Sequence, residues 1–491
     1  MSNGLILAID QGTTNTKAIA VDGKGHMVAS ASVPMAVDYP HPGWAEQSPT
    51  AIWESVRTVI AEVVAKTSPD MDALALSNQR ETIVVWDAIL DSPVAPAILW
   101  QCRRTAERCA ALRDGGHGPL IESRTGLGID PLFPASKIGW VLDAVDGARR
   151  LAEEGRFVAG TIDSWLLWNL TGKQAHATDH SNASRTQLFD TGRLEWDAEL
   201  CALFGVPPAM LPEASPSDSH FGDVLEGLTA LAGGTPIRAM MGDSHAALFG
   251  HGVRAPGTVK ATYGTGTSLM TLTRGRLTSR HGISSTIAWS TTDGGPAYAL
   301  EGNISVSGQA AAFMAELLGK GDVAELAVLA ASVPDSNGVT FVPALVGLGA
   351  PHWAPDARGI ISGLTLGVKP AHLARAAIDA IASQVADVFE AMEQDLDERL
   401  HGLSADGGAS RNDQLMQLQA DLLDRPVTRG ARAEVSALGA AMMAADGLRR
   451  PIRASDTADT FSPGMPREAR EKMRHNWREA VGRAIGTNGS R

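Results

Sequence analysis

The sequence predicts an α/β protein built from two related domains that face one cleft. The main observation is a unit that occurs twice, made of a strand-like run, a turn rich in Gly and Thr, and a second strand-like run. One unit covers residues 5–21 and the other residues 257–273, roughly 250 residues further along the chain. A chain of 491 residues, 44% of them apolar, also has enough core for two or three domains. We expect the domains at residues 1–250 and 251–491, joined around residues 250–256, with the C-terminal helical tail in the second.

The first domain opens with a predicted meander of three strands. Residues 5–10, 17–21 and 27–33 are short, mainly apolar runs, and the turn signal Asp22-Gly23-Lys24-Gly25 separates the last two. Ser48 and Pro49 are typical of the N-cap and the first position of a helix. The apolar face of that helix is predicted from residues at helical spacing, namely Ile52, Val56, Val59, Ile60 and Val63.

The second domain is expected to repeat this plan. Strands at residues 257–262 and 269–273 flank the turn at residues 263–268. Residues 372–394 have the apolar spacing of a long helix. About the last 40 residues indicate a charged amphipathic helix with a loose end of Gly, Ser and Arg.

Composition excludes several classes of protein. Acidic residues outnumber basic ones by 55 to 42, and the net charge of −13 disfavours a nucleic-acid binder, which needs a basic face. The N-terminus lacks the basic segment of a signal peptide, and no run of about 18 apolar residues predicts a membrane span. Three cysteines without a CxxC pair favour buried, inert thiols in a reducing compartment. We therefore expect a cytoplasmic protein that binds neither nucleic acid nor membrane.

The first Gly/Thr turn has the residue types of a phosphate-binding loop. From Asp10 to Lys17 it reads DQGTTNTK, in which small residues let the backbone approach a phosphate while hydroxyl and N–H groups donate to its oxygens. The carboxylate of Asp10, at the end of a buried strand, suits Mg²⁺ held through water. Taken alone the loop is a weak signal, because Gly/Thr turns are also common in plain hairpins.

Two other nucleotide-binding motifs are absent from the sequence. The Gly-Lys pairs at Gly23, Gly172 and Gly319 lack the upstream Gly and the following Ser or Thr of a Walker A loop. Gly264-Thr265-Gly266 has no third Gly at position 269, so a dinucleotide fingerprint is poorly supported.

Three further polar segments are candidates for the site. Asp243 follows the apolar run 237–241, where its carboxylate could take the proton of an attacking hydroxyl, while His245 is interpreted as a core histidine. Arg80 and Glu81, in a polar turn between two apolar runs, supply the donor and acceptor that a vicinal diol requires, although a surface ion pair would look the same. The Gly-rich segment 406–412 lies between a strand and a helix at 414–423, and there a nucleoside could rest against the backbone, although this segment taken alone favours a plain Gly-rich turn before a helix.

Together these residues resemble the FGGY family of carbohydrate kinases, and within it the glycerol kinases. The similarity extends over about residues 5–447. Its motifs are DQGTT from Asp10, NQRET from Asn78, WQCRRT from Trp100, NASRT from Asn182, YGTG from Tyr263, GLGAP from Gly347, DGGA from Asp406, and a C-terminal signature over residues 359–379. Any one of these is unspecific, whereas so many in the same order are specific.

The resemblance implies a two-domain, actin-like and ribonuclease-H-like ATPase fold, with ATP and substrate in the cleft between the domains. It implies catalysis by Asp243, with Asp243 also in the substrate pocket, and Mg²⁺ held by Asp10. The positions that match the family's substrate pocket are Arg80, Glu81, Trp100, Leu132 and Ser244. The positions that match its nucleotide contacts are Thr13, Thr14, Asn15, Lys17, Thr265, Gly308, Gly408 and Asn412.

Four positions depart from the glycerol kinase pattern. Leu132 replaces a usual Tyr, Ser244 a Gln, Ser268 a Phe, and Ala312 a Gln near the nucleotide. Loss of two aromatic rings should widen the pocket, and loss of a donor changes which hydroxyls it selects. We therefore expect a polyol of four or five carbons, or a ketose, instead of or besides glycerol.

Three alternatives remain open. One is a ketose kinase of the xylulokinase type. Another is an actin-like ATPase without a sugar acceptor, which the retained Arg80, Glu81 and Trp100 disfavour. A catalytically silent regulator is disfavoured by the intact Asp10 and Asp243. We also expect a homo-oligomer, either a dimer or a tetramer.

Overall fold

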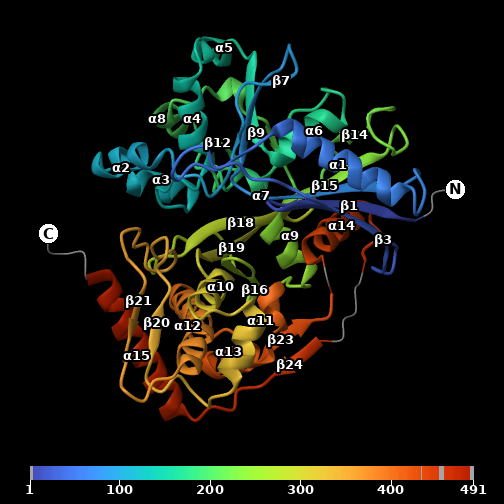
Figure 1. Ribbon diagram of the computed structural model, residues 1–491. Coiled ribbons are helices and arrows are strands. Elements are labelled where there is room, and N and C mark those ends of the chain that lie inside the picture. Colours follow the sequence, from blue (N-terminus) through green and yellow to red (C-terminus); the bar gives the residue numbers. More distant parts are fainter. Residues whose placement is uncertain (1–3, 433, 453–457, 487–491) are drawn as a thin grey trace.

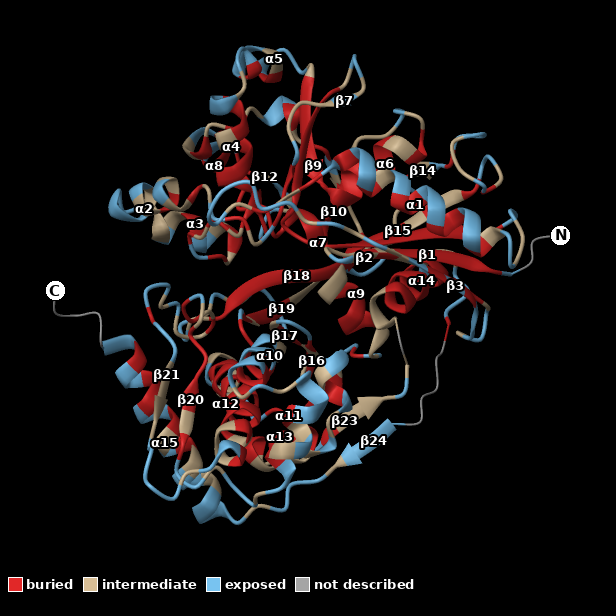
Figure 2. Cartoon of the chain, in the orientation of Figure 1, coloured by how far each residue is buried: buried red, intermediate tan, exposed pale blue. Residues whose placement is uncertain are grey.

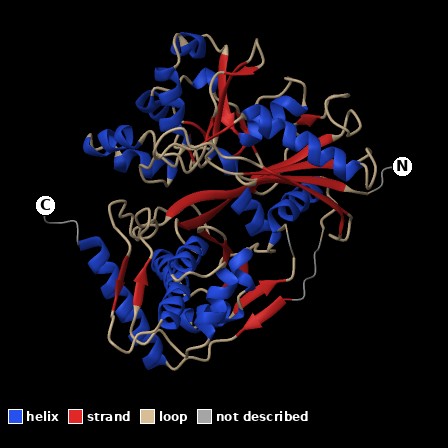
Figure 3. Cartoon of the chain, viewed as in Figure 1, coloured by secondary structure: helices blue, strands red, loops and turns tan. Residues whose placement is uncertain are grey.

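The computed structural model describes residues 4–432, 434–452 and 458–486, which form two lobes, each around a large sheet (Figures 1 and 3). The loose end expected after the last helix lies outside the described residues. Within the described chain, no helix combines the length and apolar character needed to cross a membrane. The three cysteines are free and buried, as expected. The homo-oligomer stays a prediction.

The first lobe contains a six-stranded sheet in the order β14-β15-β5-β1-β2-β3. Strands β1, β2 and β3 form the predicted antiparallel meander, while β5 and β15 run parallel to β1. The bounds are β1 Ile6–Gln11, β2 Asn15–Val21, β3 Met27–Pro34, β5 Ala73–Asn78, β14 Gly222–Asp223 and β15 Pro236–Gly242.

The second lobe repeats this topology. Its seven-stranded sheet has the order β18-β19-β17-β16-β22-β23-β24, with the same antiparallel meander and the same two parallel strands beside it. The bounds are β16 Thr258–Tyr263, β17 Thr267–Leu272, β18 Ser284–Thr291, β19 Gly295–Ile304, β22 Gly402–Asp406, β23 Val427–Gly430 and β24 Ala458–Phe461. The two Gly/Thr turns thus occupy equivalent corners of two related sheets, which confirms the predicted duplication.

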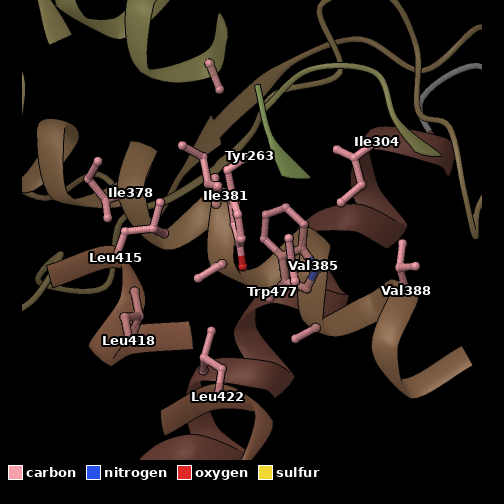
Figure 4. Close-up of a cluster of buried hydrophobic side chains, with 14 of the residues drawn as sticks. Tyr263, Ile304, Ile378, Ile381, Val385, Val388, Leu415, Leu418, Leu422 and Trp477 are labelled. Atoms are coloured by element: carbon pink, nitrogen blue, oxygen red, sulfur yellow. The ribbon is translucent and has the colours of Figure 1, made fainter. Parts of the chain in front are cut away.

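Two helices, at residues 49–64 and 370–396, follow the sequence signals closely. Helix α1 (Pro49–Val64) begins after Ser48, whose side chain caps the Ala51 N–H, and it buries the five predicted apolar residues. Helix α12 (Pro370–Leu396) extends two residues beyond each predicted end. With α13 (Asp413–Leu423) and α15 (Arg467–Gly486) it encloses the core of the second lobe, where Trp477, Tyr263 and Val385 pack together (Figure 4).

Two helices lie between the sheets: α9 (Asp243–Gly250), which follows β15, and α14 (Val435–Gly447), which follows β23. Helix α14 comes late in the chain, yet it packs against α9 and against β1, β5 and β15 of the first sheet. One buried cluster accordingly joins side chains from both halves, and Figure 2 shows the strands and helices of this region almost wholly buried. The division of the chain at residue 250 stays a prediction, and the two halves share part of their core.

The remaining elements surround these layers. A five-stranded sheet contains β4 (Glu46–Gln47), β6 (Ile83–Asp87), β7 (Ser92–Pro93), β8 (Ala97–Ile98) and β9 (Phe157–Thr161). Helices of the first lobe are α2 (Ala106–Asp114), α3 (Gly118–Thr125), α4 (Pro134–Ala144), α5 (Ala148–Glu153), α6 (Ile162–Leu170), α7 (His180–Ala183) and α8 (Ala198–Phe204). The second lobe adds α10 (Gly308–Leu317), α11 (Val323–Ala331), β20 (Thr340–Val342) and β21 (Ile360–Ser362). Short pairs are β10 (Ala177–Asp179) with β13 (Glu213–Ser215), and β11 (Phe189–Asp190) with β12 (Glu195–Trp196).

His176 makes the first lobe sensitive to acid. Its ring lies against those of Trp86 and Trp168, and its Nε2 is 3.0 Å from the Ala159 carbonyl oxygen. Burial lowers the pKa of His176 from 6.5 to about 4. The folded state then binds fewer protons than the unfolded state. The contribution of His176 to the free energy of unfolding is therefore complete above pH 6.5 and is lost as the pH falls towards 4.

We expect the lowered pKa of His176 to cost about 2 kcal/mol of stability at pH 5 relative to pH 7. His176→Gln, which keeps a donor for the Ala159 carbonyl but cannot titrate, should reduce the fall in the apparent melting temperature between pH 7 and pH 5. Thermal denaturation across that range measures the fall. The control is His475→Gln, whose side chain on α15 is 70% exposed. Equal acid sensitivity of both variants would contradict the assignment.

Candidate active site

The predicted site residues of the first lobe leave the sheet at one edge. Strands β1, β5 and β15 are parallel, and their registers align Gln11 with Asn78 and Asn78 with Gly242. Asp10, the segment that begins at Gln79, and Asp243 therefore emerge side by side. This is the arrangement that an open parallel sheet gives to a ligand site at the carboxyl ends of its strands.

The first Gly/Thr turn is held by glutamine side chains. Gln47 Nε2 donates to the Thr13 carbonyl oxygen at 2.7 Å, and the Thr13 hydroxyl donates to Gln79 Oε1 at 3.0 Å. Gln79 Nε2 in turn donates to Gln11 Oε1 at 3.1 Å. Asn15 Nδ2 donates to the hydroxyl of Thr14, which is exposed at the tip of the turn. Hydrogen bonds to glutamine side chains thus fix the base of the turn, while its tip is exposed to solvent and accessible to a ligand.

Asp10 and Lys17 lie opposite each other in the β1–β2 ladder. The Ser77 hydroxyl donates to Asp10 Oδ1 at 2.7 Å. Burial, and next the charge of Asp243, raise the pKa of Asp10 to about 6. Lys17 Nζ contacts both carboxylate oxygens of Glu434, at 2.8 and 2.9 Å, directly before α14. The predicted phosphate contact of Lys17 is therefore occupied by an acidic residue from the other half of the chain.

Asp243 is the first residue of α9 and its side chain is about a third exposed, at 37%. Arg80 Nε donates to Asp243 Oδ1 at 3.1 Å, and the Ser244 backbone N–H donates to the same oxygen at 2.6 Å. The start of a helix and a guanidinium both favour the anionic carboxylate. His245, by contrast, is fully buried with its Nε2 3.3 Å from the Thr286 hydroxyl, and burial lowers its pKa well below 6.5.

Arg80 and Glu81 are buried, and each binds a different partner. Arg80 Nη1 donates to Glu301 Oε1 at 2.5 Å, and Nη2 donates to the Ser244 hydroxyl at 3.2 Å. Arg185 Nε donates to Glu81 Oε1 at 2.7 Å. The surface ion pair that was the alternative reading of these two neighbours is therefore wrong, because both side chains point into the protein and not towards each other.

Lys137 connects two further pocket residues. It is fully buried, and its Nζ donates to the Leu132 carbonyl at 2.7 Å and to the Glu81 carbonyl at 3.0 Å. Burial lowers the pKa of Lys137 to about 7. Glu81 has the left-handed backbone angle φ of 60°, an uncommon conformation for a residue with a side chain. The two hydrogen bonds of Lys137 therefore hold the backbone of both pocket positions.

Trp100 connects the predicted substrate pocket to the first Gly/Thr turn. Its indole Nε1 donates to the Thr13 hydroxyl at 3.0 Å, and its side chain remains 39% exposed. Trp100 thus contacts the loop predicted to bind phosphate and is also exposed to solvent, where a substrate could bind.

The second Gly/Thr turn packs on the start of α10. The backbone N–H groups of Ser307 and Gln309 donate to the Thr265 carbonyl at 3.0 and 3.1 Å. A Cβ atom at Gly308 would lie 2.5 Å from the Gly264 carbonyl oxygen, so only glycine allows this approach. Thr265 and Gly308, predicted from separate parts of the sequence, are therefore adjacent.

The predicted nucleoside segment leads into α13. Gly407 has a φ of 90°, and a Cβ atom there would lie 2.4 Å from the Tyr263 carbonyl oxygen, whereas the Cβ direction of Gly408 is open. Asn412 Oδ1 accepts from the Leu415 N–H at 3.1 Å and so caps the helix. Asn412 therefore has a structural role in addition to any contact with a ligand.

The sequence reasoning missed Glu301 as a site residue, and it treated Arg185 only as part of a motif. Arg185 Nη1 lies 2.9 Å from Glu301 Oε2, and both side chains are completely buried. The available signal was that Glu301 is the single charged residue of β19, because a charge in a buried strand requires a partner.

The chain matches the sequence profile of the FGGY family of carbohydrate kinases, with the N-terminal domain at residues 5–250 and the C-terminal domain at residues 259–447. A glycerol kinase of Citrifermentans bemidjiense is 47% identical over 98% of this chain and 99% of its own. An apulose kinase of Pectobacterium atrosepticum is 46% identical over 99% of both chains. The crystal structure of Plasmodium falciparum glycerol kinase with ADP matches with a TM-score of 0.92 at 30% identity, covering 98% of both chains.

Proposed function

We propose a catalytic base and an acceptor for this chain, which belongs to the FGGY family of carbohydrate kinases and transfers phosphate from ATP to a hydroxyl group of a sugar or polyol. The general base is Asp243. The acceptor is a polyol or ketose of four or five carbons, used instead of or besides glycerol. The fold is the actin-like ATPase fold that the resemblance implied. The observation that carries the proposal is the contact of Asp243 with Arg80, which orients a partly exposed carboxylate at the carboxyl edge of the sheet.

The acceptor is bound beside Asp243. Arg80 and Ser244 supply donors next to the base, and Glu81 supplies an acceptor held by Arg185. Trp100 and Leu132 form the apolar side of the pocket. A group within reach of one hydroxyl is suited to remove its proton, and the guanidinium of Arg80 orients the carboxylate that does so.

The nucleotide is bound between the two Gly/Thr turns. Thr14 donates to a phosphate oxygen from the exposed tip of the first turn, with Thr13 and Asn15 beside it, and Thr265 with Gly308 approaches the phosphates from the second turn. Gly408 and Asn412 contact the nucleoside. Lys17 joins the phosphate contacts by exchanging the carboxylate of Glu434 for a phosphate oxygen, because its ammonium group is paired with Glu434.

The residues present fit a Mg²⁺ ion. Asp10 is a partly buried carboxyl whose pKa is raised to about 6 by burial and by the charge of Asp243, so a nearby cation would offset a repulsion that exists without it. Asp10 would hold the ion through water, as is usual for Mg²⁺ near phosphates. When bound, Mg²⁺ supplies positive charge that offsets the charge on the transferred phosphoryl group.

The transfer step depends on the position of the two halves of the chain. Asp243 accepts the proton of the acceptor hydroxyl, whose oxygen attacks the γ-phosphorus in line with the leaving ADP. Closure of the lobes excludes water, which would otherwise compete with the sugar for the phosphate.

The acceptor is tested by coupled ADP release with ATP and Mg²⁺ on glycerol, erythritol, threitol, xylitol, arabinitol, ribitol, xylulose, ribulose and apulose. We expect the highest kcat/KM on an acceptor larger than glycerol. Leu132→Tyr and Ser268→Phe, which restore rings usual in glycerol kinases, should shift the preference towards glycerol by at least about tenfold each, since even a single methylene in a pocket changes discrimination by about 10–200-fold. Leu364→Tyr, at a 62% exposed position, is the matched control. Highest kcat/KM on glycerol in the unmodified enzyme would refute the larger acceptor.

The same assay separates the alternatives. A xylulokinase-type activity appears as a preference for ketoses, a possibility that the similarity to an apulose kinase supports. An actin-like ATPase releases ADP at a rate that does not depend on any acceptor. We also propose a cytoplasmic location, which the free and buried state of Cys102, Cys109 and Cys201 supports.

A further inference from the structure

Glu301 is a buried acidic residue that contacts two arginines from the other half of the chain. Its Oε1 accepts from Arg80 Nη1 at 2.5 Å, and its Oε2 lies 2.9 Å from Arg185 Nη1. The side chains of Glu301 and Arg185 are completely buried, and that of Arg80 is 8% exposed. A carboxylate of the second sheet is thus the shared counter-charge of two guanidinium groups from the first lobe.

The position of Glu301 follows from the strand that carries it. In β19 it pairs with Met270 of β17, and its neighbour Leu300 belongs to the apolar core of the second lobe. Because side chains alternate along a strand, Glu301 points to the opposite face of the sheet, where Met270 and α9 lie. The Ser268 hydroxyl, one of the four departures from the glycerol kinase pattern, also donates to Glu301 Oε1 at 3.3 Å.

These contacts form one continuous chain of ion pairs. It runs from Asp243 to Arg80, then to Glu301, then to Arg185, and ends at Glu81. Burial alone would raise the pKa of Glu301, but the charges of Arg185 and Arg80 more than offset it and hold the pKa well below its usual range. Glu301 is therefore ionised in the folded protein. Loss of its charge would leave two buried guanidinium groups without their common partner.

We propose that Glu301 is a positioning residue of the acceptor pocket, which fixes Arg80 directly and Glu81 through Arg185 in the orientation that binds the acceptor hydroxyls. This inference rests on the proposed assignment of Arg80 and Glu81 to the acceptor. Glu301 itself contacts no substrate. It couples the two lobes, because the pocket residues of the first lobe take their orientation from a strand of the second.

The test is Glu301→Gln, which keeps the shape of the side chain and removes its charge. We expect the KM for the best acceptor to rise by about 10–100-fold, the effect of leaving a buried charged partner unsatisfied. The KM for ATP and the slow ATP hydrolysis without an acceptor should stay within about twofold, because, in the part of the chain that the structure describes, the only residue of the two Gly/Thr turns that contacts Glu301 is Ser268, which is not among the predicted phosphate contacts. A purely structural loss would change all three quantities together. Glu316→Gln, on the exposed side of α10, is the matched control and should change none of them.

Arg185→Lys is the second variant, used also if Glu301→Gln does not fold. Lysine keeps the charge but cannot bridge Glu81 and Glu301 with separate nitrogens, so the same rise in acceptor KM is expected with an unchanged KM for ATP. An acceptor KM within twofold of the unmodified enzyme in the folded variants would overturn the inference.

Arg80→Lys identifies which proposal is at fault. If it raises the acceptor KM while the other two variants do not, only the role of Glu301 is wrong, and if it also has no effect, the proposed pocket is wrong.

Discussion

Asp243→Ala is expected to lower kcat by about 10²–10⁴, the usual contribution of a general base. The carboxylate is oriented by Arg80 Nε and by the Ser244 N–H, and it is the proposed acceptor of the substrate proton. Its removal leaves the hydroxyl to lose its proton to solvent, while the nucleotide loops and the rest of the pocket remain. The loss should therefore appear mainly in kcat and only weakly in the KM for ATP.

The assay is coupled ADP release at saturating ATP and acceptor, with thermal denaturation as a check on folding. Asp243→Asn separates charge from shape, since the amide oxygen can still accept from Arg80, and it should lose nearly as much kcat as the alanine variant. Asp293→Ala, at a side chain that is 86% exposed, is the control and should retain full activity. A nearly normal kcat in folded Asp243→Ala would remove this residue from the role of base.

Gly439→Ala is expected to destabilise the protein by about 3 kcal/mol or more, at the upper end for overpacking of a core. A Cβ atom at Gly439 would lie 1.8 Å from the Ala246 carbonyl oxygen and 2.9 Å from the Gly250 nitrogen. Both contacts are with the backbone of α9, so no side-chain rotation can relieve them. The two helices between the sheets would have to separate, and this would shift Asp243, at the start of α9, relative to Asp10 on β1.

Thermal denaturation measures this effect, and a lowered melting temperature should be accompanied by lower activity at moderate temperature. Gly482→Ala is a matched control, because it introduces the same methyl group into α15 where no atom lies within 4 Å. That variant should be stabilised by about 0.5–1 kcal/mol, since alanine is the better helix former. Equal melting temperatures for the Gly439→Ala variant and the unmodified protein would show that the contact between α9 and α14 tolerates a methyl group.

The elements that could be predicted from the sequence are those with local causes. The first hairpin was predicted from apolar runs and a turn, and α1 from a serine cap, a proline and helical spacing. The duplicated strand–turn–strand unit predicted two related sheets, which the strand orders confirm. Each of these signals acts over a few residues, so the linear order of the chain is sufficient to detect it.

The partners of charged side chains could not be predicted in this way. Glu81 follows Arg80 directly, yet its ion-pair partner is Arg185, and Lys17 meets Glu434 more than 400 residues later, with a sequence separation of 417. Glu301 gave a weak signal as a single charge in an apolar strand, but nothing in the sequence indicated which cations it would meet. Such pairs form only when segments far apart in the sequence pack together.

The sequence by itself determined the class of the protein, the first three strands, the repeated strand–turn–strand unit and the helices with clear apolar spacing, because these depend on local periodicity and on a long series of motifs. Only the tertiary structure decided that α14 completes the first lobe and that Arg80 and Glu81 take their partners from elsewhere. The physical reason is burial. A charge removed from water must be paired by whichever opposite charge the fold brings near, and that choice depends on packing between distant segments.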